Sequence, residues 1–222
     1  AEADERAVLM YDQLDSGLSD HPENPKNWRV ERFVDEVDHI RRAFGLERLH
    51  VCGHSWGGTV ALEYAACQPK GLASAILGSP LVSTRSWLAD ANKLRGDLPA
   101  DTQQTLASCE ATSTPPEPQC DAATDIFYAH YRHRTQGYPA LVAYRDTLGG
   151  SNKKLYNAMW GRTEFISTGT LKDYDGEPLL AKLDGPRTLF VTGQFDEARP
   201  ETIGGFARRV PGAEFAVMPG SG

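Results

Sequence analysis

The sequence lacks the features that define several large classes of protein. No apolar run approaches the roughly 18–20 residues that a membrane-spanning helix requires, and no basic-then-apolar signal segment opens the chain. Basic side chains are in deficit, because 23 Lys and Arg face 30 Asp and Glu and leave a formal net charge of −7. Such a deficit argues against nucleic acid or an anionic membrane as the main partner. We therefore expect a soluble protein that binds neither.

Cysteine is scarce, and its spacing excludes the common metal sites. The four cysteines (Cys52, Cys67, Cys109 and Cys120) form no C-x-x-C pair and match no zinc-ligand spacing. Cys52 and Cys67 fall on a predicted inner strand and an amphipathic helix, which predicts two buried thiols. Cys109 and Cys120 flank a proline-rich patch, and the residues leave open whether they form a disulfide. No glycine pattern for binding phosphate is present either, so we expect no metal and no cofactor.

The 222 residues, 40% of them hydrophobic, suit one globular domain of good size. Apolar runs predict strands at Val8–Tyr11, Leu49–Cys52, Leu72–Leu77, Arg187–Thr192 and Glu214–Met218. Helical periodicity predicts helices at Val30–Phe44, Thr59–Cys67 and Glu201–Arg209. Strands that alternate with helices in this way indicate β-α-β units and a parallel sheet.

A long interruption divides this alternation. Between about residue 83 and residue 185 the sequence has no comparable strand but carries helical stretches at Trp87–Arg95, Thr124–Arg134 and Pro139–Thr147. We predict a helical cap inserted into an α/β domain. Residues 1–82 and 186–222 then form the two parts of the α/β core, and residues 83–185 form the cap.

The segment Gly53-His54-Ser55-Trp56-Gly57 fits the pattern G-x-S-x-G between a predicted strand and a predicted helix. In that context a strained turn exposes the serine hydroxyl, and small residues two positions before and two after it let strand and helix pack closely. We predict that Ser55 is a catalytic nucleophile. The N–H of Trp56, at the helix N-terminus, would donate to the oxyanion. The alternative is a glycine-rich turn that only caps a helix.

A carboxylate partner follows a later strand. Asp196 lies on the loop after Arg187–Thr192, at the same edge of a parallel sheet as Ser55. A buried aspartate in that place would orient a histidine and stabilise its imidazolium form. We predict that Asp196 is the catalytic acid, and the alternative is an aspartate that caps the next helix.

The general base is missing from the expected place. In this arrangement the histidine comes after the acid, but all six histidines precede Asp196: His21, His39, His50, His54, His130 and His133. Side chains of adjacent residues diverge at such a turn, so we interpret His54 as a packing residue or as one that supports the site without taking the Ser55 proton. His130 and His133 lie in the predicted cap and are poor substitutes. We predict that these 222 residues lack the catalytic histidine and are inactive alone.

Both ends of the sequence fit a chain that continues. A predicted strand begins within ten residues of Ala1, and the final turn Pro219–Gly222 directly follows another predicted strand. We expect the middle of a chain of about 300 residues, the size of an α/β domain with a cap. The simpler alternative is that the ends were trimmed.

Nearly the whole chain resembles proline iminopeptidases and related aminopeptidases and amidases of the α/β-hydrolase fold. The resemblance depends on Tyr11–Ser19, Val30–Asp38, Gly53–Thr59, Tyr156–Phe165, Thr168–Asp173 and Gly193–Pro200. It implies Ser55 as nucleophile, Asp196 as acid and the Trp56 N–H as an oxyanion donor. It also implies that Glu164, in the cap, and Glu197 bind the free ammonium group of the substrate. Two carboxylates around one cation would make a free amine the condition for entry.

The sequence also departs from the family pattern. Asp15 stands where the family usually has glycine, in a loop near the site. The family's His-Gly-Gly-Pro-Gly loop, its catalytic histidine and the strand between those predicted at Val8–Tyr11 and Leu49–Cys52 are absent. Unpaired strand edges beside such a gap would expose backbone and apolar groups, so we expect the chain to be poorly soluble alone.

These observations together predict a serine aminopeptidase that releases an N-terminal residue, preferentially proline, through an acyl-enzyme. The predicted substrates are short peptides or amino-acid amides with a free N-terminus, and the predicted location is the cytoplasm, with secretion left open. One alternative is an amino-acid amidase or esterase of the same fold. The other is an inactive fragment that only binds.

Overall fold

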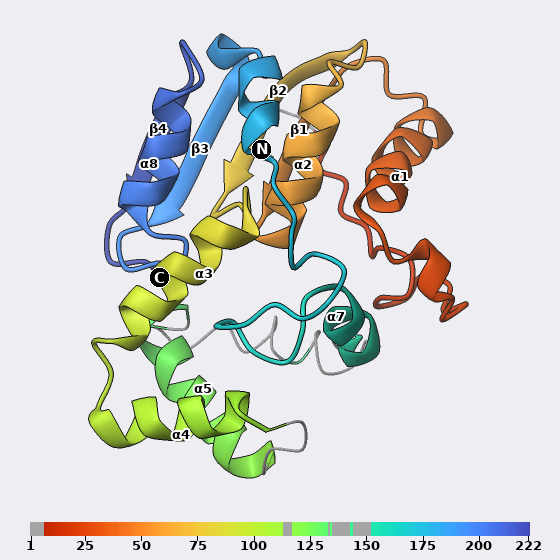
Figure 1. Cartoon of the computed structure of the whole chain (residues 1–222). Coiled ribbons are helices and arrows are strands. Elements are labelled where there is room, and N and C mark those ends of the chain that lie inside the picture. The colour runs from red at the N-terminus through yellow and green to blue at the C-terminus, as the bar shows by residue number, and fades with distance from the viewer. Residues whose placement is uncertain (1–6, 113–116, 133, 135–142, 144–151) are drawn as a thin grey trace.

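The computed structural model describes residues 7–112, 117–132, 134, 143 and 152–222 (Figure 1). Its centre is a parallel sheet of β1 (Leu49–His54), β2 (Leu72–Gly78), β3 (Thr188–Gly193) and β4 (Glu214–Met218), in the order β1-β2-β3-β4. The predicted parallel α/β fold is confirmed. Because the strands are parallel, the segments that leave their carboxyl ends meet at one edge of the sheet.

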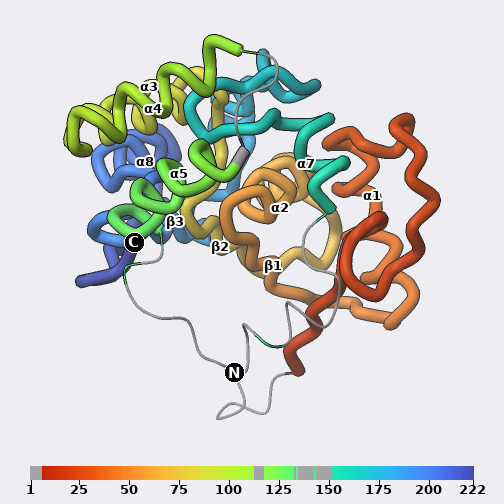
Figure 2. The backbone as a smooth tube through the Cα atoms, turned by 90° about the horizontal axis from the view of Figure 1, so that it is seen from below, coloured from red at the N-terminus to blue at the C-terminus, as the bar shows by residue number. Residues whose placement is uncertain are grey.

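Three helices accompany this sheet: α1 (Val30–Ala43), α2 (Trp56–Ala66) and α8 (Pro200–Arg208). Helix α2 packs on β1 and β2, α8 packs on β3 and β4, and α1 lies against α2 (Figure 1). Figure 2 shows α2 and α8 on the same face of the sheet. Leu62, Leu77, Phe190 and Ile203 are at most 2% exposed and form the core between these helices and the sheet. Burial of such side chains stabilises the fold by about 1.5–3 kcal/mol each.

A helical layer lies beyond the carboxyl ends of the strands (Figure 1). It contains α3 (Thr84–Arg95), α4 (Ala100–Glu110), α5 (Glu117–Tyr131) and α7 (Lys153–Met159). Three short 3₁₀ helices complete the described elements: η2 (Pro25–Asn27), η3 (Glu177–Lys182) and η4 (Gly185–Arg187). The layer has a small apolar core of its own around Leu106, Phe127 and Phe165.

The chain enters this layer after β2 and leaves it before β3, as the sequence predicts for a cap. The exact division at residues 82/83 and 185/186 stays a prediction. Helices α4 and α7 were not predicted, because their apolar residues are few and irregularly spaced. The helix predicted at Pro139–Thr147 lies almost wholly outside the described residues.

One predicted strand is wrong. Residues 7–10 form no strand, and Val8 and Met10 are 66% and 90% exposed. An apolar run becomes a strand only when a neighbouring strand accepts its hydrogen bonds. Within the described part of the chain β1 pairs with β2 alone, so Val8–Tyr11 has no such neighbour.

The cysteines also differ from the prediction. Cys52 and Cys67 are exposed thiols, not buried ones. On β1 the exposed residues alternate with partly buried ones, and Cys52 points to the face away from α2. Cys109 and Cys120, whose pairing the sequence left open, form a disulfide that joins α4 to α5.

No helix among the described residues is long and apolar enough to cross a membrane.

Candidate active site

Ser55 occupies the sharp turn between β1 and α2. Its backbone angles are φ 53° and ψ −118°, a region that side chains other than glycine rarely adopt. The N–H of Ser55 donates to the carbonyl of Gly78 at the end of β2, over 2.8 Å. The strained turn predicted from the motif is therefore present, and β2 helps to hold it.

Two glycines make this turn possible, and only one of them belongs to the G-x-S-x-G pattern. A Cβ on Gly53 would lie 1.9 Å from the carbonyl oxygen of Gly57. A Cβ on Gly58 would lie 2.8 Å from the Pro80 Cβ, whereas a Cβ on Gly57 would meet nothing within 4 Å. The close approach of strand and helix therefore requires Gly53 and Gly58. The prediction that Gly57 provides it is wrong.

Trp56 begins α2, directly after Ser55. As the first residue of the helix, it has a backbone N–H with no acceptor inside the helix, as an oxyanion donor requires. The indole Nε1–H donates to Gln13 Oε1 over 3.0 Å, and the ring meets Phe33 edge-on at 5.6 Å. These two contacts hold the first residue of α2 in place and thereby position the Trp56 N–H.

Asp196 lies on the loop after β3 and is 7% exposed. Its Oδ1 accepts the N–H of Ala198 over 2.8 Å, and its Oδ2 accepts the hydroxyl of Ser79 over 2.6 Å. The Gly193 N–H adds a longer bond of 3.4 Å to Oδ2. Helix α8, which follows, has no side-chain cap. The alternative interpretation, in which Asp196 caps the next helix, is therefore wrong.

Ser79 is the site residue that the sequence did not reveal. It is 5% exposed, directly follows β2 and has a positive φ of 42°. Its N–H donates to the Val191 carbonyl on β3 over 2.7 Å, and its hydroxyl holds Asp196. The Ser55 N–H also donates to the carbonyl of Gly78. These contacts therefore connect the turn of Ser55 after β1 to the loop of Asp196 after β3, through the residues at the end of β2. The only signal in the sequence was a serine at the carboxyl end of a predicted strand.

Glu164 lies in the cap among aromatic side chains and is 6% exposed. Its Oε1 accepts the hydroxyls of Tyr128 and Tyr156 over 3.0 and 2.9 Å, and its Oε2 accepts the Trp87 Nε1–H over 3.3 Å. The half-exposed guanidinium of Arg132 lies 3.9 Å from Oε1. The carboxylate is thus inside the cap rather than on its surface.

Glu197 follows Asp196 directly and is 8% exposed. Burial raises the pKa of Glu197 well above its usual range, the carboxylate of Glu164 raises it further, and Arg132 opposes the shift. Its Oε2 has no hydrogen-bond partner in the described part of the chain. The structure therefore brings both predicted amine-binding carboxylates into one electrostatic cluster, with one oxygen unsatisfied.

The described histidines make local contacts. His21, His39 and His130 each contact the carbonyl oxygen of the residue four positions earlier, and His50 Nδ1 contacts Ser74 Oγ. His54 is exposed, which contradicts a packing role, and its role in supporting the site stays a prediction. His133 lies outside the described residues.

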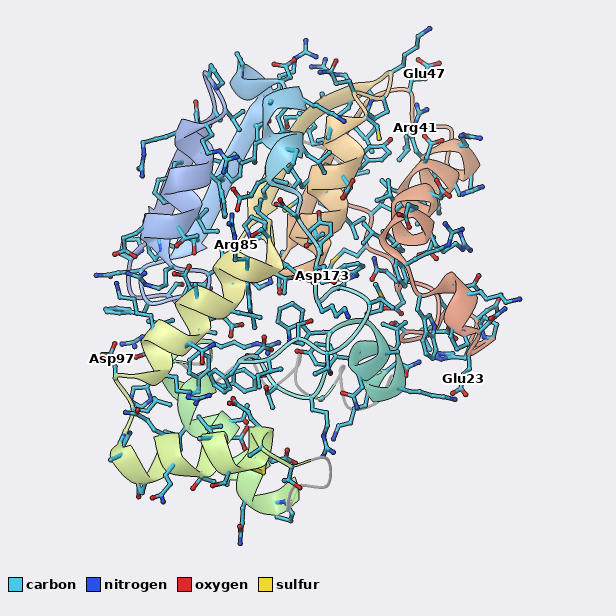
Figure 3. All side chains as sticks on the ribbon, in the orientation of Figure 1. Glu23, Arg41, Glu47, Arg85, Asp97 and Asp173 are labelled. Atoms are coloured by element: carbon cyan, nitrogen blue, oxygen red, sulfur yellow. A yellow bond between two sulfur atoms is a disulfide. The ribbon has the colours of Figure 1, made fainter. Side chains whose placement is uncertain are left out.

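Asp15, the departure from the family pattern, is fully buried and has a φ of 64°. Its carboxylate accepts the Trp28 Nε1–H and the Glu23 N–H, both over 2.8 Å, and its carbonyl oxygen accepts the Asn152 amide. Glu23, labelled in Figure 3, reaches Lys154 on α7 over 2.7 Å. Asp15 thus braces the segment before α1 against the start of α7.

Comparison with known proteins agrees with this geometry. The model of the alpha/beta hydrolase fold family matches residues 1–222. A protein named proline iminopeptidase from Heyndrickxia coagulans is 37% identical over 216 residues, which cover 97% of this chain and 74% of that protein. The chain belongs to the proline iminopeptidase family of α/β hydrolases. The resemblance and the fold expected from the sequence are confirmed.

Solved structures support the same assignment. The crystal structure of VinJ superposes with a TM-score of 0.85 at 32% identity and covers 94% of this chain and 71% of its own. The proline iminopeptidase of Mycobacterium smegmatis superposes with a TM-score of 0.76 at 34% identity and covers 89% of this chain and 66% of its own. The protein is therefore a hydrolase of the proline iminopeptidase family.

Proposed function

We propose that this protein is a serine aminopeptidase that releases an N-terminal residue, preferentially proline, from short peptides. The observation that carries the proposal is the buried pair Glu164 and Glu197, with Glu197 adjacent to Asp196. Buried carboxylates seek a cationic partner, and the ammonium group of a free N-terminus supplies one. Proteins named proline iminopeptidase that share about a third of the sequence support proline as the preferred residue.

In the proposed reaction the hydroxyl oxygen of Ser55 attacks the carbonyl carbon of the N-terminal residue while a base takes the hydroxyl proton. The Trp56 N–H donates to the oxygen that becomes negative. The C–N bond then breaks, the amine leaves with the proton from the base, and an ester on Ser55 remains. Water attacks this ester in the same way and releases the amino acid. Asp196 orients and stabilises the protonated base.

We further propose that none of the six histidines of this sequence is the base, and that these 222 residues alone are inactive. The contacts of His21, His39 and His130 are with carbonyl oxygens one helical turn or loop away. His50 lies at the start of β1, the opposite end from Ser55. His54 neighbours Ser55 in the chain, and side chains of adjacent residues diverge at such a turn.

The compartment stays a prediction. Disulfides form and persist mainly in oxidising compartments, so the bond between Cys109 and Cys120 favours export over the predicted cytoplasmic location.

The proposed function is tested on the full polypeptide that contains these residues. We expect kcat/KM for prolyl p-nitroanilide to exceed the value for the alanyl compound, and a fluorophosphonate probe to label Ser55. The Ser55→Ala variant should lose both turnover and labelling. Faster turnover of simple acyl esters and of prolinamide than of prolyl peptides would instead favour an esterase or amidase. Absence of labelling in the full polypeptide would contradict the enzyme assignment.

A further inference from the structure

Three consecutive residues before α1 each form a hydrogen bond with a different helix. The Oε1 of Gln13 accepts the indole N–H of Trp56 on α2 over 3.0 Å. The Leu14 N–H donates to Glu36 on α1 over 3.4 Å. The Asp15 carbonyl oxygen accepts the side-chain amide of the residue that caps α7, over 3.0 Å. We call these three residues the strap, because they join the nucleophile helix to the cap.

The backbone of the strap is held in one conformation. Asp15 is fully buried and has a φ of 64°, in the left-handed region. Its carboxylate accepts the Trp28 Nε1–H and the Glu23 N–H, both over 2.8 Å. The Ser16 N–H donates back to the Gln13 carbonyl over 2.9 Å. A shift of Asp15 would therefore move Gln13 as well.

The cap end of the strap depends on one side chain. The Oδ1 of Asn152 accepts the N–H groups of Lys154 and Leu155 over 3.0 and 3.1 Å and so caps α7. Its Nδ2–H donates to the strap. Helix α7 lies beside the segment that precedes α1 (Figure 1), and it carries Tyr156, whose hydroxyl donates to Glu164 over 2.9 Å. The same amide therefore starts the cap helix that carries Tyr156 and holds the strap.

The other end of the strap acts on the candidate oxyanion donor. Trp56 is the first residue of α2, so its backbone N–H has no acceptor inside the helix. The indole has one hydrogen-bond donor, and Gln13 accepts it. Ring and backbone N–H belong to one residue, so a bond that fixes the ring also limits the direction of the N–H. An oxyanion donor is effective when it is aimed in advance at the oxygen that becomes negative.

On the basis of the proposed serine-hydrolase reaction, we propose that Gln13 is a positioning residue for the Trp56 N–H, and that the cap sets its place through Asn152 and Asp15. Gln13 acts through Trp56, and Asn152 acts through the strap. The cap thus has a second task besides forming the amine site, because α7 helps to align the donor that stabilises the oxyanion.

The proposal predicts a loss in kcat rather than a rise in KM. The negative oxygen exists in the transition state and not in the bound substrate, so a misdirected donor slows the reaction without weakening substrate binding. Cyclopentanecarbonyl p-nitrophenyl ester has the same ring as prolyl p-nitroanilide but no amine. Attack on either carbonyl forms a negative oxygen, so kcat/KM should fall for both compounds.

The test uses the full polypeptide. Gln13→Leu removes the acceptor but keeps a side chain of similar size, and Trp56→Phe removes the indole N–H but keeps a ring against Phe33. We expect each to lower kcat for prolyl p-nitroanilide about 10–100-fold, with KM changed by less than about twofold. The double variant should be no slower than the slower single variant, because both changes break the same bond.

Two inhibitors separate alignment of the donor from general damage to the site. Prolinal, the aldehyde of proline, adds the Ser55 hydroxyl across its carbonyl, and the oxygen of the resulting hemiacetal takes the place of the oxyanion. Prolinol has no carbonyl and binds without this step. In Gln13→Leu the inhibition constant of prolinal should rise about 10-fold or more, while that of prolinol should stay within about twofold.

The cap end of the strap is tested by Asn152→Ser. Serine keeps an oxygen that caps α7, but its side chain has no amide to reach Asp15. We expect kcat to fall about 2–10-fold with KM unchanged, and this fall should vanish in a Gln13→Leu background. The variant leaves Gln13 and Trp56 in place, so it tests the strap even if Gln13→Leu does not fold.

The matched control is Gln68→Leu. Gln68 lies just beyond the other end of α2 and donates to the Lys182 carbonyl over 2.7 Å. The change removes a glutamine hydrogen bond beside the same helix, and it should lower stability without lowering kcat.

Three outcomes would overturn the inference. Losses that multiply in the Gln13→Leu, Trp56→Phe double variant would do so, as would equal rises in the inhibition constants of prolinal and prolinol. The third is an equal fall of kcat in Gln68→Leu. A wild-type protein that hydrolyses the ester but not the prolyl compound would contradict the proposed aminopeptidase function instead. The inference would then be judged by kcat/KM for the ester, which Gln13→Leu should still lower about 10-fold or more.

Discussion

At the scale of single residues, the site depends on backbone strain that its neighbours maintain. Ser55 and Ser79 both have positive φ angles, of 53° and 42°, and both follow strands of the sheet. Such conformations cost about 1–3 kcal/mol each and persist only where surrounding contacts require them. The Ser55 N–H bond to Gly78 and the Ser79 N–H bond to Val191 are contacts of this kind. Strain at two strand ends thus places two hydroxyl groups at one edge of the sheet.

The glycines around Ser55 lead to a first prediction. Gly57→Ala should fold with unchanged or higher stability, by up to about 1 kcal/mol, because the position is helical and open. Gly58→Ala should destabilise the protein by about 1–3 kcal/mol, because its Cβ would overlap Pro80. Denaturant unfolding of both variants gives the comparison. Equal stability of the two would contradict the packing seen at this turn.

Ser79 leads to a second prediction. Ser79→Ala removes a charge-assisted hydrogen bond of 2.6 Å to Asp196, and such bonds contribute about 1.5–3 kcal/mol. We expect kcat for prolyl p-nitroanilide to fall about 10-fold or more with little change in KM, because Asp196 loses its orientation while the amine site is untouched. Steady-state kinetics across pH measure this.

The matched control is Thr84→Val, which removes another buried hydroxyl, bonded to the Leu171 carbonyl over 2.7 Å outside the site. It should lower stability without lowering kcat. If the two variants have the same kcat, Ser79 does not position the acid.

At the scale of elements, the cap contains a disulfide-linked helical hairpin. Cys109 near the end of α4 and Cys120 on α5 are 11 residues apart and both are buried. Helix α5 carries Tyr128 toward Glu164, and α4 packs against α5. The disulfide therefore supports the helix from which one wall of the candidate amine site is built.

Loss of this disulfide leads to a third prediction. Loop closure over so short a segment stabilises the hairpin by about 3 kcal/mol. We expect the Cys109→Ala, Cys120→Ala double variant to speed hydrogen exchange in α4 and α5 and to leave β2 and β3 unaffected. The exposed thiols give the control. The Cys52→Ala, Cys67→Ala double variant should leave the rate of hydrogen exchange unchanged in α4 and α5 and in β2 and β3. In denaturant, thiol titration of the 222-residue polypeptide should find two free thiols before reduction and four afterwards. Uniform destabilisation of the whole molecule would contradict a local role.

At the scale of the whole molecule, ion pairs join the cap to the core. Arg199, before α8, pairs with Asp90 on α3 over 3.2 Å, and both side chains are largely buried. Glu177 in η3 joins Arg85 on α3 to Arg209 beyond α8; Figure 3 labels Arg85 on the helix that leads into the cap. These pairs fix α3, and with it Trp87, relative to the strand ends that carry Ser55 and Asp196.

Exposed apolar side chains lead to a fourth prediction. Val8 and Met10, together with Phe215, Val217 and Met218 on β4, are 39–90% exposed. Surfaces of this kind promote association. We expect the 222-residue polypeptide to self-associate at micromolar concentration in sedimentation experiments and to show no turnover of prolyl p-nitroanilide. The full polypeptide, measured in parallel, should be active. A monomeric and active 222-residue polypeptide would contradict both expectations.

Much of the fold followed from local patterns. The strand-to-helix turn at Ser55 and the loop position of Asp196 were predictable because each depends on residues adjacent in the chain. The same holds for α1, which ends at Ala43 just before Gly45 with its φ of 62°. The strand at Val8–Tyr11 failed because strand formation depends on a partner and not on composition alone.

What the sequence determined by itself is therefore the alternation of the four sheet strands with α1, α2 and α8, the strained turn at Ser55 and the family. Only the tertiary structure decided that Ser79 holds Asp196 across 117 residues of sequence and that Tyr128, Tyr156 and Trp87 hold Glu164. It also decided that Gly58 rather than Gly57 permits the turn, and that Glu197 keeps an unsatisfied oxygen. The physical reason is that backbone preference acts between neighbours in the chain. The satisfaction of a buried polar group depends instead on which distant side chains the packing brings within hydrogen-bonding distance.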